Sequence, residues 1–178
     1  MITPEQIIEI MPNCPRGVIS DYAQILNESM AEGKINTVVR SAAFLGQIAH
    51  ESGDLRLLVE QSNGKEYEGR RDLGNIKAGD GPMFKGRGPI QLTGRANYRR
   101  AGNALGLPLE EQPSLVEQPR IGFRTTVFYW TDHKLNELAD KLDYLAITRA
   151  INGGLNGYSH RLEKIVLALG VIGRDVKI

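Results

Sequence analysis

Glycine and proline cut this chain of 178 residues into short apolar segments, and their spacing constrains the fold more than any other feature. The clearest segment, residues 37–51, contains no proline and one glycine, Gly46. Its apolar residues recur every three or four positions, which is the period of an amphipathic α-helix. We therefore expect a mainly helical chain, with a helix here that Asn36 caps and Gly53 ends.

The same punctuation predicts the other elements. Thr3, Pro4 and Gln6 have the form of a helix start with a capping box. Further helices are expected over residues 3–10, 18–31, 97–105, 121–135, 142–151 and 159–169, with stops at Gly33, Gly106, Gly153 and Gly170. Residues 61–88 are rich in glycine and charge and predict a long loop. Residues 83–93 predict a turn and a short strand, the only β element expected.

Charge and cysteine content narrow the function. Lys plus Arg is 22 and Asp plus Glu is 21, so binding of nucleic acid through bulk charge is not expected. A single cysteine, Cys14, excludes an intramolecular disulfide and a cysteine-based zinc site. The three histidines lack metal-ligand spacing, so we expect no metal and no cofactor. No repeat or linker divides the chain, which predicts one catalytic domain over residues 1–178, without a separate wall-binding module.

A pair of carboxylates is the natural source of chemistry in such a chain. Glu51 ends the 37–51 helix, where the negative end of the helix dipole disfavours the ionised form and suits a proton donor. Glu60 follows nine residues later, and two carboxylates are what glycosidic cleavage needs. From spacing alone, a pair of solvated surface glutamates is the favoured interpretation.

Two glycine-containing segments offer polar side chains to a ligand. Gln91 and Thr93 alternate with Ile90 and Leu92, so in an extended run both would lie on one face. The alternative is a Gly-Pro turn whose polar side chains only satisfy the backbone. Asn152, before two glycines, either caps a turn or projects an amide into a cleft.

Three segments together resemble the motifs of the family 19 chitinases and related phage endolysins. They are His50-Glu51-Ser52-Gly53, Phe84 to Gly102 with its Gly-Arg-Gly-Pro-Ile-Gln-Leu-Thr core, and Ile151-Asn152-Gly153-Gly154. They occur in the family's order and span residues 44–161. The resemblance implies a lysozyme-like, two-lobed helical fold with a substrate cleft and a reaction that inverts the anomeric carbon.

The resemblance also implies roles for single residues. Glu51 matches the general acid, Glu60 the base that activates water, and Thr93 the residue that holds this water. Candidates for binding the sugar, with Arg161 near the acid, are His50, Gln91, Asn97, Tyr98, Asn152 and Arg161. Plant members separate the two glutamates by a longer loop, so Glu66 and Glu68 remain rivals of Glu60.

We therefore expect an endolysin-type enzyme that hydrolyses β-1,4 glycosidic bonds of peptidoglycan. A chitinase of the same fold and an inactive aminosugar-binding protein are the alternatives. The sequence starts without a signal-like segment and has no membrane-length apolar run, so we expect a monomer that is made in the host cytoplasm and released to the wall by a separate factor. The cationic segment from His160 to Ile178, including Lys177, predicts a core-packed helix or, alternatively, contact with an anionic membrane or lipopolysaccharide.

Overall fold

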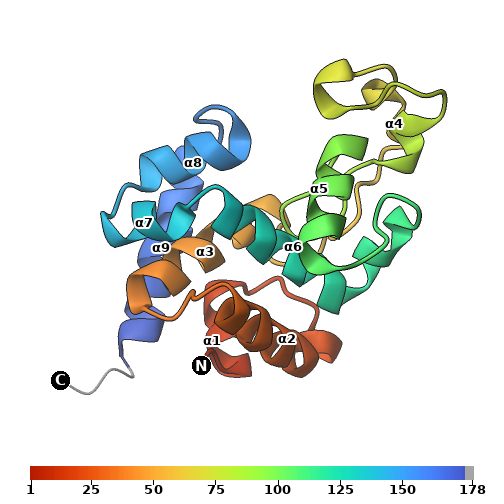
Figure 1. Cartoon of the computed structure of the whole chain (residues 1–178). Helices are drawn as coiled ribbons and strands as arrows, with labels where there is room; N and C mark the ends of the chain where they lie inside the picture. Colours follow the sequence, from red (N-terminus) through yellow and green to blue (C-terminus); the bar gives the residue numbers. More distant parts are fainter. Residues whose placement is uncertain (175–178) are drawn as a thin grey trace. The chain divides into compact units, whose positions relative to one another are not determined.

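The computed structural model describes residues 1–174 and is built almost entirely of helices (Figure 1). The α-helices are α1 (Pro4–Ile10), α2 (Ile19–Glu32), α3 (Val38–Glu51), α4 (Asp80–Met83), α5 (Arg95–Leu105), α6 (Pro119–Asp132), α7 (Leu135–Asp140), α8 (Tyr144–Asn152) and α9 (Tyr158–Gly173). Short 3-10 turns are η1 (Arg16–Val18), η2 (Lys65–Tyr67), η3 (Arg71–Leu73) and η4 (Pro113–Glu117). Isolated bridges join Arg87 to Val59 and to Leu92. The expected mainly helical class is confirmed.

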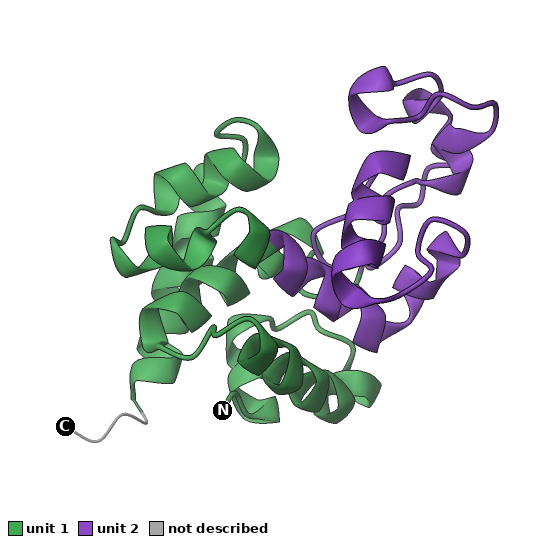
Figure 2. Cartoon of the chain, viewed as in Figure 1, with its two compact units in different colours: residues 1–56, 130–178 green, residues 57–129 purple. Residues whose placement is uncertain are grey.

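The chain divides into two compact units (Figure 2). The first unit takes residues 1–56 and the chain from residue 130 onward, and the second takes residues 57–129. Glu51 therefore belongs to the first unit and Glu60 to the second. That both units act as one catalytic domain stays a prediction.

The first unit is organised by α9, which packs along α3 (Figure 1). Gly46 allows their close approach, since a Cβ at this position would lie 2.4 Å from Cγ1 of Ile165. Beside this crossing, the buried rings of Phe44 and Trp130 meet edge to face at 5.2 Å. Packing against α9 therefore requires glycine at position 46, although glycine has a low helix propensity.

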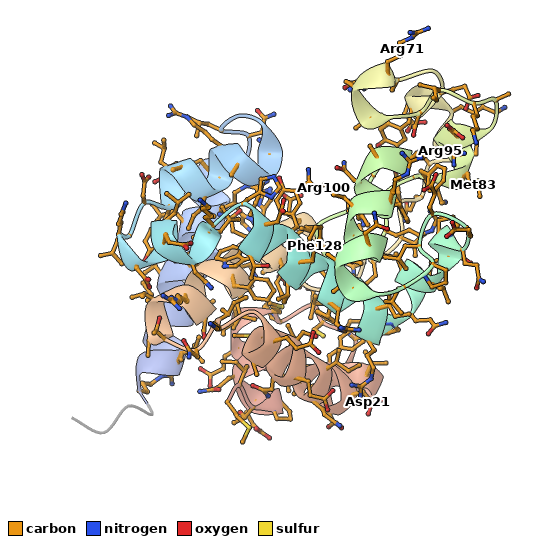
Figure 3. All side chains as sticks on the ribbon, in the orientation of Figure 1. Asp21, Arg71, Met83, Arg95, Arg100 and Phe128 are labelled. Atoms are coloured by element: carbon orange, nitrogen blue, oxygen red, sulfur yellow. The ribbon has the colours of Figure 1, made fainter. Side chains whose placement is uncertain are left out.

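The second unit has its own core and a network of charges. Its core is formed by Phe84, Leu92, Tyr98, Ala101, Leu109 and Val116. Arg95, at the start of α5, pairs with buried Asp80 and with Glu110, and Arg99 pairs with the same Glu110 (Figure 3). These pairs tie α4 to α5 and to the chain that follows it.

The helix ends test the predicted caps. Thr3 and Gln6 form the expected capping box, and Gly106 and Gly153 end their helices in the left-handed region, with φ of +66° and +72°. Thr37, rather than Asn36, caps α3, because its side chain accepts from the backbone N–H of Arg40. That cap prediction was wrong by one residue.

The last helix is longer than predicted. α9 passes through Gly170 and ends at Gly173, because nothing at Gly170 demands a left-handed backbone. Its cations are engaged: Arg161 pairs with Glu51, Lys164 with Asp54, and Arg174 with Glu9. These pairs agree with a core-packed helix, whereas Val166 and Leu167 remain exposed. Lys177 lies outside the described residues.

The predicted short strand was wrong in detail. Arg87 and Leu92 exchange backbone hydrogen bonds around a tight turn over residues 88–91. Gln91 adopts φ of +55°, which is left-handed, so Gln91 and Thr93 do not lie on one extended face. The glycine and proline of this segment favour the turn over the strand.

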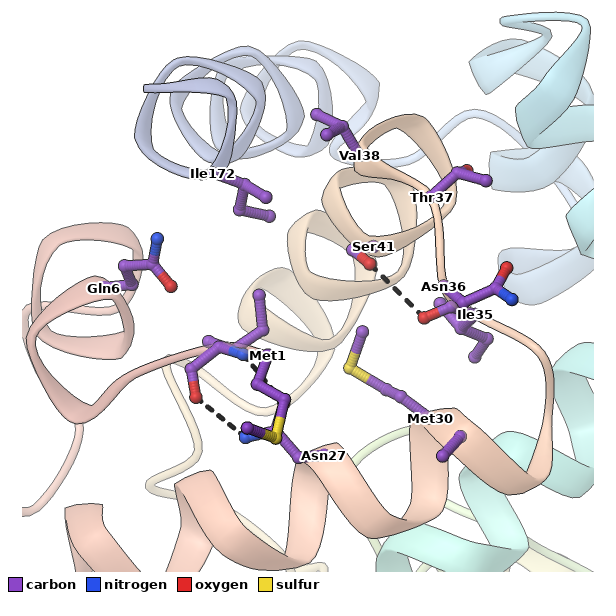
Figure 4. A pocket seen from close by; sticks show the side chains of 12 residues that line it. Met1, Gln6, Asn27, Met30, Ile35, Asn36, Thr37, Val38, Ser41 and Ile172 are labelled. Carbon is purple, nitrogen blue, oxygen red and sulfur yellow. Dashed lines mark hydrogen bonds between the residues drawn. The ribbon is translucent and has the colours of Figure 1, made fainter. Parts of the chain in front are cut away.

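A pocket of about 380 Å³ lies in the first unit among α1, α2, α3 and α9 (Figure 4). Two of its polar side chains are engaged internally, since Asn27 bonds the backbone of Ile2 and Ser41 donates to the carbonyl of Ile35. Ser41 lies ten residues before Glu51 on α3, a separation of about 15 Å along the helix. The pocket is thus distinct from the candidate catalytic residue. None of the helices within residues 1–174 has the length and hydropathy of a membrane span.

Candidate active site

Glu51 occupies the last position of α3 and faces a cation from α9. The Nη2 atom of Arg161 lies 2.5 Å from Oε1 of Glu51, although the two residues are 110 positions apart in sequence. The side chain of Arg161 is 2% exposed and that of Glu51 is 20% exposed. The carboxyl group is therefore held from inside the protein and still reaches solvent.

Arg161 is itself fixed by a chain of hydrogen bonds. Its Nη1 donates to Oε1 of Gln47 at 2.7 Å, and its Nε donates to the carbonyl of Asn156 at 3.2 Å. Gln47 in turn donates to the hydroxyl of Thr148, which donates to the carbonyl of Tyr144. Helices α3, α8 and α9 each supply one side chain to this series of hydrogen bonds, which leaves the guanidinium of Arg161 little freedom to move.

Glu51 lies near two charges of opposite sign. The C-terminal end of α3 carries the negative end of the helix dipole. The buried guanidinium of Arg161 is positive, and this contact was not predicted from spacing. Because Arg161 takes Oε1, the second oxygen is the one that can exchange a proton with a ligand.

The backbone after Glu51 is unusual. Gly53, Asp54 and Leu55 adopt φ values of +55°, +63° and +62°, a left-handed turn that side chains other than glycine rarely accept. Asp54 accepts from Nζ of Lys164 at 2.8 Å and from Asn13, and Leu55 is buried. These contacts offset the strain and fix the end of α3 directly after the catalytic candidate.

His50 and His160 lie side by side next to this pair. Their Nδ1 atoms are 2.8 Å apart and their ring centroids 5.0 Å apart. Burial chiefly, together with the charges of Arg161 and His160, lowers the pKa of His50 to about 4. Gly157 lies against this ring, since a Cβ there would be 2.3 Å from Cε1 of His50. His50 is thus neutral and tightly confined at ordinary pH.

Asn152 ends α8 before the left-handed Gly153. Its Nδ2 atom is buried and has no hydrogen-bond partner among the described residues, and the hydroxyl of Tyr144 on the same helix shares this condition. A buried amide without a partner is costly. Asn152 therefore has an unused donor, which the alternative role as a simple cap does not explain.

Glu60 is surrounded by donors in the second unit. Its Oε1 accepts from the hydroxyl of Tyr67 at 2.8 Å, and its Oε2 accepts from the backbone N–H of Gly86 at 2.8 Å. Burial raises the pKa of Tyr67 to about 12, and its hydrogen bond to Glu60 adds to the rise, so the phenol keeps its proton and donates. Both oxygens of Glu60 are therefore engaged by neutral donors.

The residues directly before Arg87 bring the backbone N–H of Gly86 to Glu60. A Cβ at Gly86 would lie 2.6 Å from Oε1 of Gln91 and 3.1 Å from Oε2 of Glu60. Lys85 ties its Nζ to the carbonyls of Glu60 and Ser62, at 2.9 and 3.1 Å. Glycine is therefore needed at position 86 for the backbone to come so near the carboxylate.

The rival carboxylates have other environments. Both oxygens of Glu68 accept backbone N–H groups, from Gly79 at 2.7 Å and from Gly81 at 2.8 Å. Glu66 is exposed and accepts from Ser62 at 2.6 Å. Glu68 thus holds the loop before α4, whereas Glu60 alone of the three receives a tyrosine and a backbone donor together.

The other candidate residues of the second unit, Gln91, Thr93 and Asn97, lie in or shortly after the turn over residues 88–91. The hydroxyl of Thr93 donates to the carbonyl of Gln91, and Asn97 donates to the carbonyl of Thr93, each at 2.8 Å. Gln91 donates to the carbonyl of Gly88 at 3.1 Å. The donor groups of these side chains are thus engaged, and their acceptor oxygens can bind a ligand or a water molecule.

Tyr98 is different, because it is fully buried in the second-unit core. Its hydroxyl donates to the carbonyl of Lys85 and accepts from Arg87, and burial raises its pKa to about 12. The expectation that Tyr98 contacts the sugar is therefore corrected. Its contacts support the backbone that carries Gly86.

The structure gathers His50, Glu51 and Arg161 in the first unit, and Glu60, Gln91, Thr93 and Asn97 in the second. Sequence reasoning missed Gln47, Thr148, His160 and Tyr67. Gln47 could have been found, since it lies one helical turn before Glu51 on the same face. The others come from segments with no sequence relation to the glutamates. Over residues 1–174, no cluster of three or more potential metal ligands occurs.

Comparison with known proteins shows the family of this chain. The sequence profile of the chitinase class I family, Glyco_hydro_19, matches residues 23–141. A "Glycosyl hydrolase family 19 domain-containing protein" of Haemophilus influenzae is 31% identical over 206 aligned residues, covering 98% of both chains. An endochitinase of Arabidopsis thaliana is 34% identical, covering 86% of this chain and 56% of the plant protein.

Solved structures show the same fold. Chitinase C from Streptomyces griseus superposes with a TM-score of 0.77 at 26% identity, covering 97% of this chain and 76% of that one. A bacterial family 19 chitinase gives a TM-score of 0.78 at 25% identity, covering 97% of this chain and 95% of that one. This likeness confirms the predicted lysozyme-like helical class. The chain therefore belongs to family 19 of the glycoside hydrolases, the chitinase class I family.

Proposed function

We propose that this glycoside hydrolase cleaves β-1,4 bonds of an aminosugar polymer, with Glu51 as general acid and Glu60 as general base. The observation that carries this proposal is the contrast between the two carboxyl groups. Glu51 has one oxygen held by a buried guanidinium, whereas Glu60 has both oxygens facing neutral donors. Two glutamates in different environments suit two different roles.

The proposed step needs no intermediate on the protein. The second oxygen of Glu51 passes its proton to the glycosidic oxygen as the bond to the anomeric carbon breaks. Glu60 removes a proton from a water molecule, whose oxygen bonds to the opposite face of that carbon. The hydroxyl of Thr93, fixed through the carbonyl of Gln91, is proposed to hold this water. The products carry an inverted anomeric centre.

We propose peptidoglycan as the polymer, in an endolysin-type role. Peptidoglycan carries carboxylates on its peptides, whereas chitin is uncharged. Arg71 (labelled in Figure 3) and Lys77 follow Glu60 in the second unit. Both are exposed, and neither has an ion-pair partner in the described part of the chain. Two such cations favour an anionic substrate.

Chitin is the second candidate, and a specific observation favours it: the plant relatives and the superposed bacterial proteins are named chitinases. Both polymers use the same acid and base, so the substrates separate only in an assay. An inactive sugar-binding protein is the least favoured alternative, because both glutamates are present and held.

The deciding experiment compares the two polymers directly. Loss of turbidity of permeabilised bacterial cells is measured beside reducing-sugar release from colloidal chitin, and the digests are analysed by mass spectrometry and NMR. We expect lysis, disaccharide-spaced products and inversion at the anomeric carbon. Activity on chitin alone would replace peptidoglycan as the substrate, and retention of configuration would overturn the proposed mechanism.

A further inference from the structure

Two neighbouring pairs of residues connect α3 to α9. His50 and Glu51 are consecutive at the end of α3, and His160 and Arg161 are consecutive near the start of α9. The histidines meet through their Nδ1 atoms at 2.8 Å, and Arg161 meets Glu51 at 2.5 Å. The helices are thus joined by two parallel links, of which only one involves the proposed acid.

The histidine link has a defined chemistry. Two Nδ1 atoms at hydrogen-bond distance require one protonated nitrogen and one lone pair. His50 is the natural acceptor, because burial first, and the charges of Arg161 and His160 next, hold its pKa at about 4. His160 donates when its tautomer carries the hydrogen on Nδ1, and its exposed ring leaves Nε2 to solvent.

The ring of His50 cannot turn away from this contact easily. Gly157 lies against its other side, where a Cβ would be 2.5 Å from Nε2. Besides His160, the charged group that acts on His50 is Arg161, and the backbone of Gly157 lies against the ring. A side chain so confined transmits its position to the next residue of the helix, which is Glu51.

We propose that His160 is a positioning residue, whose Nδ1–H donates to Nδ1 of His50 and thereby fixes the last turn of α3 so that Glu51 meets Arg161 in a single geometry. This inference rests on the proposed role of Glu51 as the general acid. His160 itself is assigned no contact with the substrate.

Three substitutions of His160 separate the hydrogen bond from the ring. His160→Asn places an amide where Nδ1 stands, His160→Phe keeps the ring without nitrogen, and His160→Gln places its amide nearer to the position of Nε2. We expect His160→Phe and His160→Gln to lower kcat about tenfold with little change in KM, because small displacements of a catalytic group are costly. His160→Asn should keep at least half of the parent kcat.

Two outcomes would overturn the proposal: a parent-like kcat in His160→Phe, or an equal loss of kcat in His160→Asn and His160→Phe. Thermal unfolding is followed for each variant, and because His160 is exposed the three Tm values should stay close to that of the parent.

A measurement without substrate tests the positioning role of His160 separately from the proposed role of Glu51 as general acid. The ¹⁵N NMR spectrum of the imidazoles should show His50 neutral, with Nδ1 unprotonated and Nε2 protonated, between pH 5.5 and 7.5, a window chosen above its pKa of about 4. His160→Phe should shift the Nδ1 signal of His50, whereas in His160→Asn this signal should stay near its position in the parent. A proton on Nδ1 of His50 in the parent would overturn the proposal, whereas an active Glu51→Gln variant with this NMR pattern would overturn only the role of Glu51.

Discussion

At the scale of single residues, Glu51 and Glu60 differ in what holds them. Glu51 depends on one cation from a distant helix, and Glu60 depends on Tyr67 and on a backbone N–H that only glycine brings near. The two carboxyl groups can therefore be tested separately, because neither shares a partner with the other.

We expect Glu51→Gln and Glu60→Gln each to lower kcat by about 10²–10⁴-fold, the range for loss of a general acid or base. Glu66→Gln is the matched control, since Glu66 is exposed and lies near Glu60 in sequence. It should retain most of the parent activity in the same assay of sugar release. Parent-like hydrolysis by Glu51→Gln would remove the central assignment.

Arg161→Met should destabilise the first unit, because it leaves Glu51 and Gln47 without their buried partner. Breaking a buried ion pair costs about 3–5 kcal/mol in the free energy of unfolding, and partial exposure of Glu51 places the expected loss at the lower end. Urea unfolding followed by tryptophan fluorescence measures it. Arg174→Met, at an exposed pair with Glu9, is the control and should change little.

The local sequence pattern singled out Glu51, whereas only the family resemblance placed its partner Arg161 near it. A helix end followed by glycine is visible in the local pattern, whereas Arg161 comes from a helix 110 residues away. Local periodicity carries no information on such a contact. The same holds for His50 and His160, and for the buried state of Tyr98, whose neighbours in sequence are polar.

At the scale of elements, the crossing of α3 and α9 depends on the absence of a side chain at Gly46. A Cβ at this position would lie 2.8 Å from the backbone N of Ile165, which cannot move as a flexible side chain could. Helix propensity alone would favour alanine there. For Gly46→Ala, packing thus predicts a lower free energy of unfolding and helix propensity predicts a higher one.

Gly46→Ala should therefore lower the free energy of unfolding by about 1–3 kcal/mol, as overpacking does. Gly170→Ala is the matched comparison, since Gly170 lies in α9 and a Cβ added there would meet no atom within 4 Å. It should raise the free energy by about 0.5–1 kcal/mol through helix propensity. Chemical unfolding of both variants checks the pair, and stabilisation by Gly46→Ala would contradict the proposed close crossing.

Element boundaries show which sequence signals are reliable. A capping box and a glycine that must adopt positive φ are local requirements, so Thr3, Gly106 and Gly153 were placed correctly. Gly170 carries no such requirement, and α9 continues through it because the apolar face that includes Ile165 and Val171 keeps packing. Gln91 was misplaced because its turn depends on the exchange of hydrogen bonds between Arg87 and Leu92.

At the scale of the whole molecule, the two units carry different titratable groups. His50, with a pKa lowered to about 4 chiefly by burial, belongs to the first unit. Asp80 and Glu110 belong to the second unit, where hydrogen bonds from Arg95 and Arg99, respectively, are the main cause that lowers each pKa to about 2. The single tryptophan, Trp130, is buried in the first unit and reports on it.

Stability should therefore fall in two separate pH windows. The unfolded chain protonates His50 near its ordinary pKa of 6.5, while the folded chain resists until about 4, so stability decreases as pH falls between these values. Asp80 and Glu110 have ordinary pKa values of 3.8 and 4.5 and folded values of about 2, so their contribution is present above pH 4.5 and is lost as pH falls toward 2. Urea midpoints at a series of pH values, measured by fluorescence and by circular dichroism, would reveal both windows.

His50→Asn separates the windows, because asparagine can still accept from His160 but does not titrate. This variant should lose the decrease of stability between pH 6.5 and 4 and keep the decrease below pH 4.5. High salt should remove only part of the decrease of stability below pH 4.5. The Arg99–Glu110 pair is partly exposed and therefore screened, whereas Asp80 is buried. An unchanged decrease of stability between pH 6.5 and 4 in His50→Asn would show that the burial of His50 does not govern the response of this protein to mild acid.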